Sequence, residues 1–341
     1  MSDSLLKVEN LTTVFDPLGQ PVVAVDDVSF EIRLGETLGL VGESGSGKSV
    51  TAFSIINLLP SHGRVTAGHV WFRGRDLLGL PEQEMRLVRG AGIGFVFQEP
   101  TTALNPVMRV GAQIAESLMV HGLATGRDAR GRAIELLRAM RIPNPEKRVD
   151  DYPHQLSGGM RQRVMIAVAV ACRPPLIIAD EPTTALDVTI QAQILDLLRG
   201  LRREFDVSLL LITHDLGVIA ETADRVAVMY AGRIVEEGPV REVFARPLHP
   251  YTEALLASIP GAAGTGSRLQ AIDGVVPNLA DLPPGCTFAP RCAQRMAVCT
   301  TAIPAMVEIR SAHATRCYLR SDRSEPRAKA SPVARATYAA R

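Results

Sequence analysis

The first thing this sequence lacks is a long hydrophobic run. Its longest apolar stretch, residues 164–172, falls well short of the roughly 18 residues that a membrane-spanning helix needs. The N-terminus also lacks a basic stretch followed by an apolar one, which is the pattern of a secretory signal. We therefore expect a cytoplasmic chain, which would act at a membrane only by docking onto other subunits.

The sequence also lacks an excess of charge of either sign. Its 37 Lys and Arg residues nearly balance its 36 Asp and Glu residues, giving a formal net charge of +1. This balance points to neither nucleic acid nor an anionic membrane surface as a partner. With 341 residues, 46% of them hydrophobic, the chain is long enough for about two domains with a full core.

A glycine-rich stretch between an expected strand (residues 36–41) and an expected helix (residues 48–59) is the most informative feature present. Its residues are Gly42, Glu43, Ser44, Gly45, Ser46, Gly47, Lys48 and Ser49. Glycines let backbone N–H groups converge on phosphate oxygens at a helix N-terminus. A lysine here reaches the β- and γ-phosphates, and the following hydroxyl ligates Mg²⁺. The context is that of a P-loop, which predicts a nucleotide site.

Nearly unbroken apolar segments predict a parallel sheet covered on both faces. We expect strands over residues 176–179 and 208–213, separated by a helix over residues 190–203. Residues 226–236, with a turn at Ala231–Gly232, predict a closing hairpin. Strands alternating with helices place the chain in the α/β class.

Two carboxylates, Asp180 and Glu181, follow the first of these apolar strands. A buried strand can deliver Asp180 beside the P-loop, where it would hold Mg²⁺ through its water shell. Glu181 would then polarise a water that attacks the γ-phosphate. An Asp-Glu pair at a strand end is more often a helix N-cap, but an upstream P-loop reverses that preference.

Ser157, Gly158 and Gly159 precede an expected helix that runs to about Cys172. Small side chains and free N–H groups at a helix N-terminus predict a second anion site. An ordinary serine N-cap with a glycine turn is the alternative. We expect Cys172 itself to be a packing residue.

Together these motifs resemble those of the nucleotide-binding subunit of an ABC transporter, over roughly residues 5–240. The resemblance implies a P-loop NTPase with a RecA-like core, an antiparallel β subdomain and an α-helical signature subdomain. Residues 42–49 match the Walker A motif and residues 156–162 the ABC signature. Asp180 matches the Walker B aspartate, and Glu181 the catalytic glutamate.

Four further matches follow from the same resemblance. Gln98 matches the Q-loop glutamine, which senses Mg²⁺ and couples to membrane subunits, and residues 185–187 match the D-loop. His214 matches the switch histidine, although a histidine ending an apolar strand would by itself be structural. Phe15 is the expected adenine-stacking aromatic. Its alternative is ordinary packing within a strand.

A finer resemblance is to the ATP-binding subunits of dipeptide, oligopeptide and nickel importers. Residues 98–106 resemble that branch's Q-loop segment, which usually has Asp, Met and Ser at positions 99, 101 and 103. Residues 180–195 and 246–252 are also typical of the branch. In this family the signature of one subunit closes over the ATP held by another, so one chain cannot complete a site.

This resemblance implies a set of partners and a location. The second ATP-binding subunit is a second copy or, as the branch favours, a paralogue. Two integral-membrane permease subunits and an extracytoplasmic solute-binding protein complete the transporter, with this chain on the cytoplasmic face of the membrane. The implied activity is ATP hydrolysis that energises uptake of peptides or a related small solute. ATP and Mg²⁺ are the implied cofactors.

Two other classes of function compete with this interpretation. A soluble ABC protein, such as a translation factor or DNA-repair ATPase, normally has two nucleotide-binding units or a long coiled-coil insertion, and neither is found here. A regulatory protein that binds ATP without turnover would not need Glu181 and His214.

The composition changes after about residue 240. We expect a nucleotide-binding domain over residues 1–240, a small C-terminal extension over residues 241–320 and a disordered tail over residues 321–341. The tail is rich in Ala, Arg, Ser and Pro. In the extension, His249 and Tyr251 are expected to pack onto the core.

The extension contains Cys286, Cys292, Cys299 and Cys317. In a chain without an export signal, such a group favours a metal site over disulfides. The spacing lacks the CxxC pairs usual in structural zinc sites, whereas four thiolates also suit a 4Fe-4S cluster. The resemblance to the importer branch favours the cluster. Zinc, and cysteines that are reduced or disulfide-linked, are the alternatives.

Overall fold

The computed structural model describes residues 4–16, 19–184, 187–258 and 272–320. The tail expected to be disordered lies outside these residues, as do Ala185 and Leu186 of the expected D-loop. Within the described part of the chain, every helix is too short or too polar to span a membrane.

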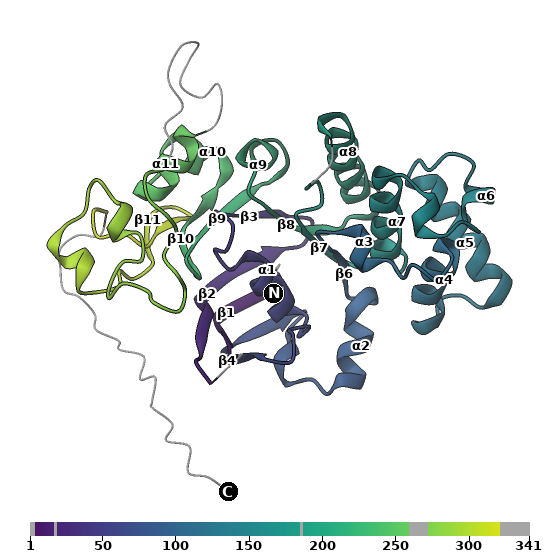
Figure 1. Ribbon diagram of the computed structural model, residues 1–341, viewed down its shortest axis with the longest axis horizontal. Helices are drawn as coiled ribbons and strands as arrows, with labels where there is room; N and C mark the ends of the chain where they lie inside the picture. Colours follow the sequence, from purple (N-terminus) through teal and green to yellow (C-terminus); the bar gives the residue numbers. More distant parts are fainter. Residues whose placement is uncertain (1–3, 17–18, 185–186, 259–271, 321–341) are drawn as a thin grey trace, which may run out of the picture.

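Two β-sheets form the framework of the molecule (Figure 1). The smaller sheet has four strands in the order β2-β1-β4-β5, and its neighbouring strands are antiparallel. Its strands are β1 (Ser4–Phe15), β2 (Val22–Arg33), β4 (Gly63–Phe72) and β5 (Arg75–Asp76). This sheet is the antiparallel β part that the sequence led us to expect.

The larger sheet is mixed and has eight strands in the order β11-β12-β10-β9-β3-β8-β7-β6. Strands β9, β3, β8, β7 and β6 are parallel, whereas β10, β12 and β11 continue the sheet antiparallel. The strands are β3 (Thr37–Val41), β6 (Ile93–Val96), β7 (Leu176–Asp180), β8 (Ser208–Thr213), β9 (Arg225–Tyr230), β10 (Arg233–Pro239), β11 (Val307–Arg310) and β12 (His313–Thr315). The expected apolar strands and the closing hairpin are therefore confirmed.

Alternation along the parallel strands explains why both faces of the larger sheet are buried. On β8, Leu210 and Ile212 join a core that lies against the smaller sheet and α1. Leu209 and Leu211 point to the other face and join a core formed with the helices. Strands covered on both sides can be apolar throughout, because neither face meets water.

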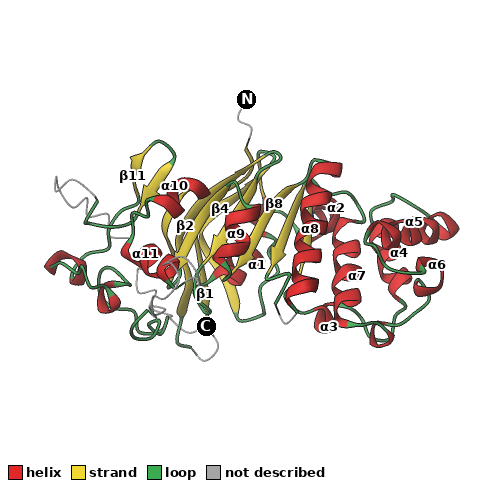
Figure 2. Ribbon diagram, turned by 90° about the horizontal axis from the view of Figure 1, so that it is seen from above, coloured by secondary structure: helices red, strands yellow, loops and turns green. Residues whose placement is uncertain are grey.

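Helices cover the sheets and extend from one end (Figures 1 and 2). They are α1 (Lys48–Ile55), α2 (Glu82–Ala91), α3 (Pro100–Ala103), α4 (Val110–Val120), α5 (Gly126–Ala139), α6 (Pro145–Arg148), α7 (Gly158–Val170), α8 (Val188–Phe205), α9 (Leu216–Thr222), α10 (Val240–Ala245) and α11 (Pro250–Ala257). Helix α1 is shorter than the predicted helix over residues 48–59. It ends early because Asn57 takes a left-handed conformation, with a φ of 48°.

The C-terminal segment, defined here as the described residues after 245, lies at the opposite end from helices α4–α7 (Figure 1). Besides α11, β11 and β12 it has two short 3₁₀ turns, Ala289–Arg291 and Ala297–Thr300. Strand β12 attaches it to the larger sheet by pairing with β10. The segment is thus continuous with the sheet that also carries the P-loop.

Candidate nucleotide-binding site

The predicted P-loop lies between β3 and α1, at the carboxyl end of a buried strand (Figure 1). Gly47 has a φ of +103°, and a Cβ atom there would lie 2.6 Å from the carbonyl oxygen of Ala24. A Cβ atom at Gly42 would lie 2.1 Å from the carbonyl oxygen of Met229. Neighbouring backbone therefore excludes any side chain at these positions. The loop ends at the N-terminus of α1, whose free N–H groups favour an anion.

Lys48 folds its side chain back over this loop. Its ammonium group donates hydrogen bonds to the carbonyl oxygens of Gly42 and Glu43, at 2.9 and 3.0 Å. Only 5% of Lys48 is exposed, and burial lowers the pKa of its ammonium group. A buried cation with neutral hydrogen-bond partners favours an anionic ligand beside it, because the charge is otherwise poorly compensated.

Asp180 ends β7 beside the P-loop. Ser49 Oγ donates a hydrogen bond to Asp180 Oδ1 at 3.0 Å, so two of the predicted Mg²⁺ ligands are in direct contact. Asp180 is 2% exposed, and burial raises its pKa to about 6. A cation held by this carboxylate would favour its ionised form.

Glu181 is the centre of a group of polar side chains. Gln98 Nε2 donates to Glu181 Oε2 at 3.3 Å, and Thr184 Oγ1 donates to the same oxygen at 2.7 Å. His214 Nδ1 lies 3.4 Å from Glu181 Oε1. Glu181 also has a φ of 45°, a strained conformation for a residue with a side chain. The structure therefore brings together all three predicted catalytic residues, Glu181, His214 and Gln98.

The predicted signature residues lie elsewhere in the chain. Ser157 caps α7, and its side chain accepts a hydrogen bond from the Met160 N–H at 3.4 Å. Helix α7 is among the helices that extend from one end, away from α1 (Figures 1 and 2). Among the described residues, no hydrogen bond joins Ser157, Gly158 or Gly159 to the P-loop. One chain thus keeps its two predicted phosphate-binding elements apart.

Phe15 lies at the end of β1, as expected for a residue near the rim of the site. Its ring centroid is 5.5 Å from that of His62, and the ring covers Gly63 closely. The ring is partly exposed, so it is accessible to a stacking partner.

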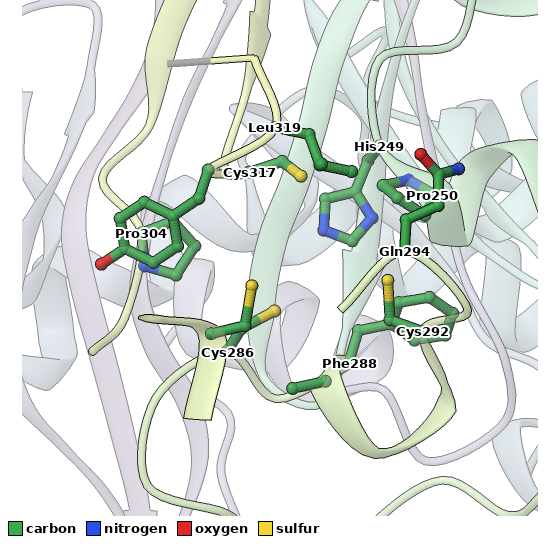
Figure 3. Close-up of a pocket in the computed structure, with 12 residues that line it drawn as sticks. His249, Pro250, Cys286, Phe288, Cys292, Gln294, Pro304, Cys317 and Leu319 are labelled. Carbon is green, nitrogen blue, oxygen red and sulfur yellow. The ribbon is translucent and has the colours of Figure 1, made fainter. Parts of the chain in front are cut away.

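Four cysteines of the C-terminal segment line one pocket (Figure 3). They are Cys286, Cys292, Cys299 and Cys317. All five cysteines of the chain are free thiols, so the disulfide alternative does not hold in this structure. Burial raises the pKa values of Cys286, Cys292 and Cys317, the last to about 11. The protein alone therefore keeps these three thiols protonated at neutral pH.

The arrangement of the pocket does not match a single-metal site. In the part of the chain that the structure describes, no three His, Cys, Asp or Glu side chains are placed to hold a metal ion. Zinc would require four ligands at about 2.0–2.3 Å, and these cysteines do not form such a set. The expected 4Fe-4S cluster likewise gains no support from ligand geometry. What the structure does provide is the convergence of four thiols on one space.

His249 also lines this pocket and is 1% exposed. Its N–H donates to Glu236 Oε2 at 2.8 Å, and its Nδ1 accepts from the Tyr251 N–H at 3.0 Å. These contacts agree with the expected packing of His249 onto the core. Its Nε2 is buried with no hydrogen-bond partner among the described residues.

The sequence alone did not reveal two residues that contact the P-loop. Arg291 forms an ion pair with Glu43, and Tyr251 Oη accepts a hydrogen bond from the Glu43 N–H. Both belong to the C-terminal segment, more than 200 positions away in the sequence. No local pattern could have indicated these contacts, because Arg291 lies in a short 3₁₀ turn with no periodicity to interpret.

Comparison with known proteins agrees with this geometry. The ABC transporter family model matches residues 25–184, and the model of the oligopeptide/dipeptide transporter C-terminal region matches residues 235–299. The dipeptide transport ATP-binding protein DppD of Bacillus subtilis (strain 168) is 49% identical over 324 residues, covering 95% of this chain and 97% of that protein. The oligopeptide transport ATP-binding protein AppD of the same organism is 51% identical over 317 residues, covering 93% and 97%.

Solved structures show the same fold. The dimeric post-hydrolysis state of the ATP-binding cassette MJ0796 bound to ADP and Pi matches with a TM-score of 0.62 and 32% identity, over 69% of this chain and 99% of that one. The chain cbiO1 from Clostridium perfringens, part of the ABC transporter complex cbiONQ, matches with a TM-score of 0.61 and 28% identity, over 72% and 92%. The described chain therefore has the P-loop ATPase cassette fold, and it belongs to the family of ABC transporter ATP-binding subunits that includes the dipeptide and oligopeptide transport proteins.

Proposed function

We propose that this chain is the ATP-hydrolysing subunit of an ABC importer and energises uptake of peptides or a related small solute. The observation that carries the proposal is the contact of Gln98 and His214 with Glu181, beside the P-loop and Asp180. The relatives named for dipeptide and oligopeptide transport support the choice of solute class.

The site residues can be given distinct roles on this basis. The P-loop, residues 42–49, would bind the phosphates through backbone N–H groups and Lys48, with Phe15 stacking on the adenine. Ser49, Asp180 and Gln98 fit Mg²⁺, because a hydroxyl, a carboxylate and an amide offer the oxygen ligands that this ion prefers. When bound, Mg²⁺ neutralises charge that develops on the phosphates.

Glu181 would orient the attacking water and accept its proton. Thr184 and Gln98 hold one carboxylate oxygen by hydrogen bonds, which leaves the other oxygen facing His214. A carboxylate held in one orientation loses little entropy on reaching the transition state. His214 keeps 61% of its side chain exposed, so it remains free to approach a γ-phosphate.

The separation of the signature from the P-loop supports a second ATP-binding subunit. Ser157, Gly158 and Gly159 would close over ATP held by that subunit, which we propose to be a paralogue. Two permease subunits and a solute-binding protein would complete the transporter, with this chain on the cytoplasmic face of the membrane. We propose no nucleic-acid partner, since the charges of the chain balance.

We also propose a domain division and a cofactor. The nucleotide-binding domain would comprise residues 1–240 and the extension residues 241–320, with residues 321–341 as a tail. Cys286, Cys292, Cys299 and Cys317 would hold a 4Fe-4S cluster. Such a cluster binds one thiolate at each of four irons, so its ligands converge without meeting at a single ion. The four thiols around one pocket support this donor set, whereas the absence of single-ion geometry among the described residues does not decide it.

Iron and acid-labile sulfide analysis of anaerobically purified protein tests the cluster. We expect about four irons and four sulfides per chain, lost in Cys286→Ser and kept in Cys172→Ser. Zinc alone, or no metal, would rule out the cluster while leaving the ATPase proposal intact.

Steady-state ATPase activity of the complete transporter tests the main proposal. We expect Glu181→Gln to lower kcat at least about 100-fold while ATP still binds, because the variant loses the proton acceptor but keeps the P-loop. Size-exclusion chromatography in ATP and Mg²⁺ should then show the two ATP-binding subunits locked together. Glu135→Gln, an exposed residue on α5, is the matched control and should behave as wild type. Normal turnover in Glu181→Gln would contradict the assignment.

A further inference from the structure

Glu43, the second residue of the P-loop, is held from three directions. Its carbonyl oxygen accepts a hydrogen bond from Lys48 Nζ at 3.0 Å, and its N–H donates to Tyr251 Oη at 2.9 Å. Its carboxylate accepts two hydrogen bonds from the Arg291 guanidinium, at 2.7 and 3.1 Å. Two of its three partners, Tyr251 and Arg291, therefore come from the C-terminal segment.

The Arg291 side chain is itself fixed in place. It is 5% exposed, and its Nε donates to the carbonyl oxygen of Asp273 at 3.0 Å. Its Cζ lies 5.8 Å from the centroid of the Tyr230 ring. A two-pronged, nearly buried pair fixes both partners in orientation, because the planar guanidinium matches the carboxylate at both oxygens.

Tyr251 is equally well supported. It is fully buried, and its ring centroid lies 4.6 Å from that of Tyr230 and 5.3 Å from that of Phe288. Phe288 and Arg291 lie between Cys286 and Cys292 in the sequence. The stretch 286–292 therefore contacts the P-loop with one side and forms part of the cysteine-lined pocket with the other.

We propose that Arg291 and Tyr251 are positioning residues for nucleotide binding, through which the C-terminal segment holds the start of the P-loop. The inference rests on the proposed function, because it takes residues 42–49 as the ATP phosphate site. The Glu43 carbonyl is one of the acceptors of Lys48, so a displaced Glu43 changes where the Lys48 ammonium lies. Coupling of this kind is reciprocal: nucleotide at the P-loop stabilises the segment to the same extent.

Nucleotide affinity of the full-length chain tests the proposal. We expect Arg291→Ala to raise the Kd for MANT-ATP with Mg²⁺ about tenfold, because a charged, nearly buried hydrogen-bonded pair is lost. Arg291→Lys should fall between, since lysine restores the charge without the two-pronged geometry. Arg310→Ala, an exposed arginine on β11 of the same segment, should bind as wild type. In the complete transporter, Arg291→Ala should raise KM for ATP while kcat stays within about twofold.

A double-mutant cycle separates positioning from general damage. Glu43→Gln should weaken binding much as Arg291→Ala does, and combining the two should weaken it little further. Additive losses, or a lower kcat with unchanged KM, would overturn the inference. If Arg291→Ala fails to fold, Arg291→Lys and Tyr251→Phe carry the test. Tyr251→Phe removes only the Oη contact and should raise the Kd about threefold.

Hydrogen exchange supplies a reading that a purely structural role would not give. Adding ATP and Mg²⁺ to the Glu181→Gln chain should slow amide exchange over residues 286–292, and Glu43→Gln should remove that protection. Unchanged exchange would overturn the inference. Lys48→Ala separates the two proposals. If it still binds MANT-ATP, the P-loop assignment fails, whereas if it loses binding and Arg291→Ala does not, only the positioning role fails.

Discussion

Ser49 and Asp180 are 131 positions apart in the sequence, yet the Ser49 hydroxyl donates a hydrogen bond to the Asp180 carboxylate at 3.0 Å. The contact joins the start of α1 to the end of β7. Strand β3, which leads into the P-loop, and β7 both pair with β8, so the parallel sheet aligns their carboxyl ends. The fold thereby places a hydroxyl and a carboxylate where one Mg²⁺ ion could bind both.

Asp180→Asn should lower the ATPase rate of the complete transporter at least about 100-fold, because an amide holds Mg²⁺ far more weakly than a carboxylate. MANT-ATP binding should lose its dependence on Mg²⁺, which a titration with and without EDTA would measure. Asp196→Asn on α8 is the matched control, since Asp196 is exposed and its printed partner is Arg199. Mg²⁺-dependent binding that survives in Asp180→Asn would contradict the assignment of this ligand.

His214→Ala should lower kcat about 10- to 100-fold and leave the KM for ATP nearly unchanged. The reason is that His214 contacts Glu181 rather than the P-loop, so it would act in the hydrolytic step and not in binding. Steady-state kinetics of the complete transporter measure both constants. His69→Ala, in β4 of the smaller sheet, should leave both unchanged. An increase in KM alone would move His214 into a binding role.

Glu236→Gln should lower the free energy of unfolding by about 2–3 kcal/mol. Glu236 is fully buried, and it accepts hydrogen bonds from the Leu248 and His249 N–H groups and contacts His313 Nε2 at 2.8 Å. An amide at this position would turn an N–H donor toward another donor. Urea unfolding measures the change, with Glu242→Gln, an exposed residue of α10, as control. A loss no larger than in the control would show that this junction does not anchor the C-terminal segment.

Glu237 predicts a specific pH dependence of stability. Burial raises its pKa from the ordinary value of 4.5 to about 7, although Arg225 pairs with it, because Glu31 and Glu36 compete for the same guanidinium. Between these two pH values the unfolded chain has lost this proton while the folded chain retains it. Rising pH therefore favours the unfolded state, and the contribution of Glu237 to stability disappears as pH passes 7.

Thermal unfolding of wild type and Glu237→Gln from about pH 5 to pH 8 measures this effect. We expect the Tm of wild type to fall relative to that of Glu237→Gln as pH rises. The Glu242→Gln control should keep a constant difference from wild type. A wild-type Tm that rises relative to the variant would reverse the sign of the expected linkage.

Local pattern was sufficient to predict much of the fold. The apolar segments that became β7 and β8 are buried on both faces, and such segments are recognisable because every residue in them is apolar. The end of α1 was predicted too late because Asn57 takes its left-handed conformation from its surroundings rather than from its neighbours in the sequence. Glu181, Gln98 and His214 could be named from their motifs, but their mutual contacts depend on how β6, β7 and β8 align.

The sequence by itself determined the P-loop, the Asp180–Glu181 pair, the signature serine and the family resemblance, because each is a short pattern whose chemistry is set by neighbouring residues. Only the tertiary structure decided that four cysteines line one pocket and that Arg291 and Tyr251 hold Glu43. Those contacts join segments more than 200 residues apart. Their distances depend on the pairing of β10 with β12 and on the packing of aromatic rings beneath the P-loop, and neither leaves a periodic signal in the sequence.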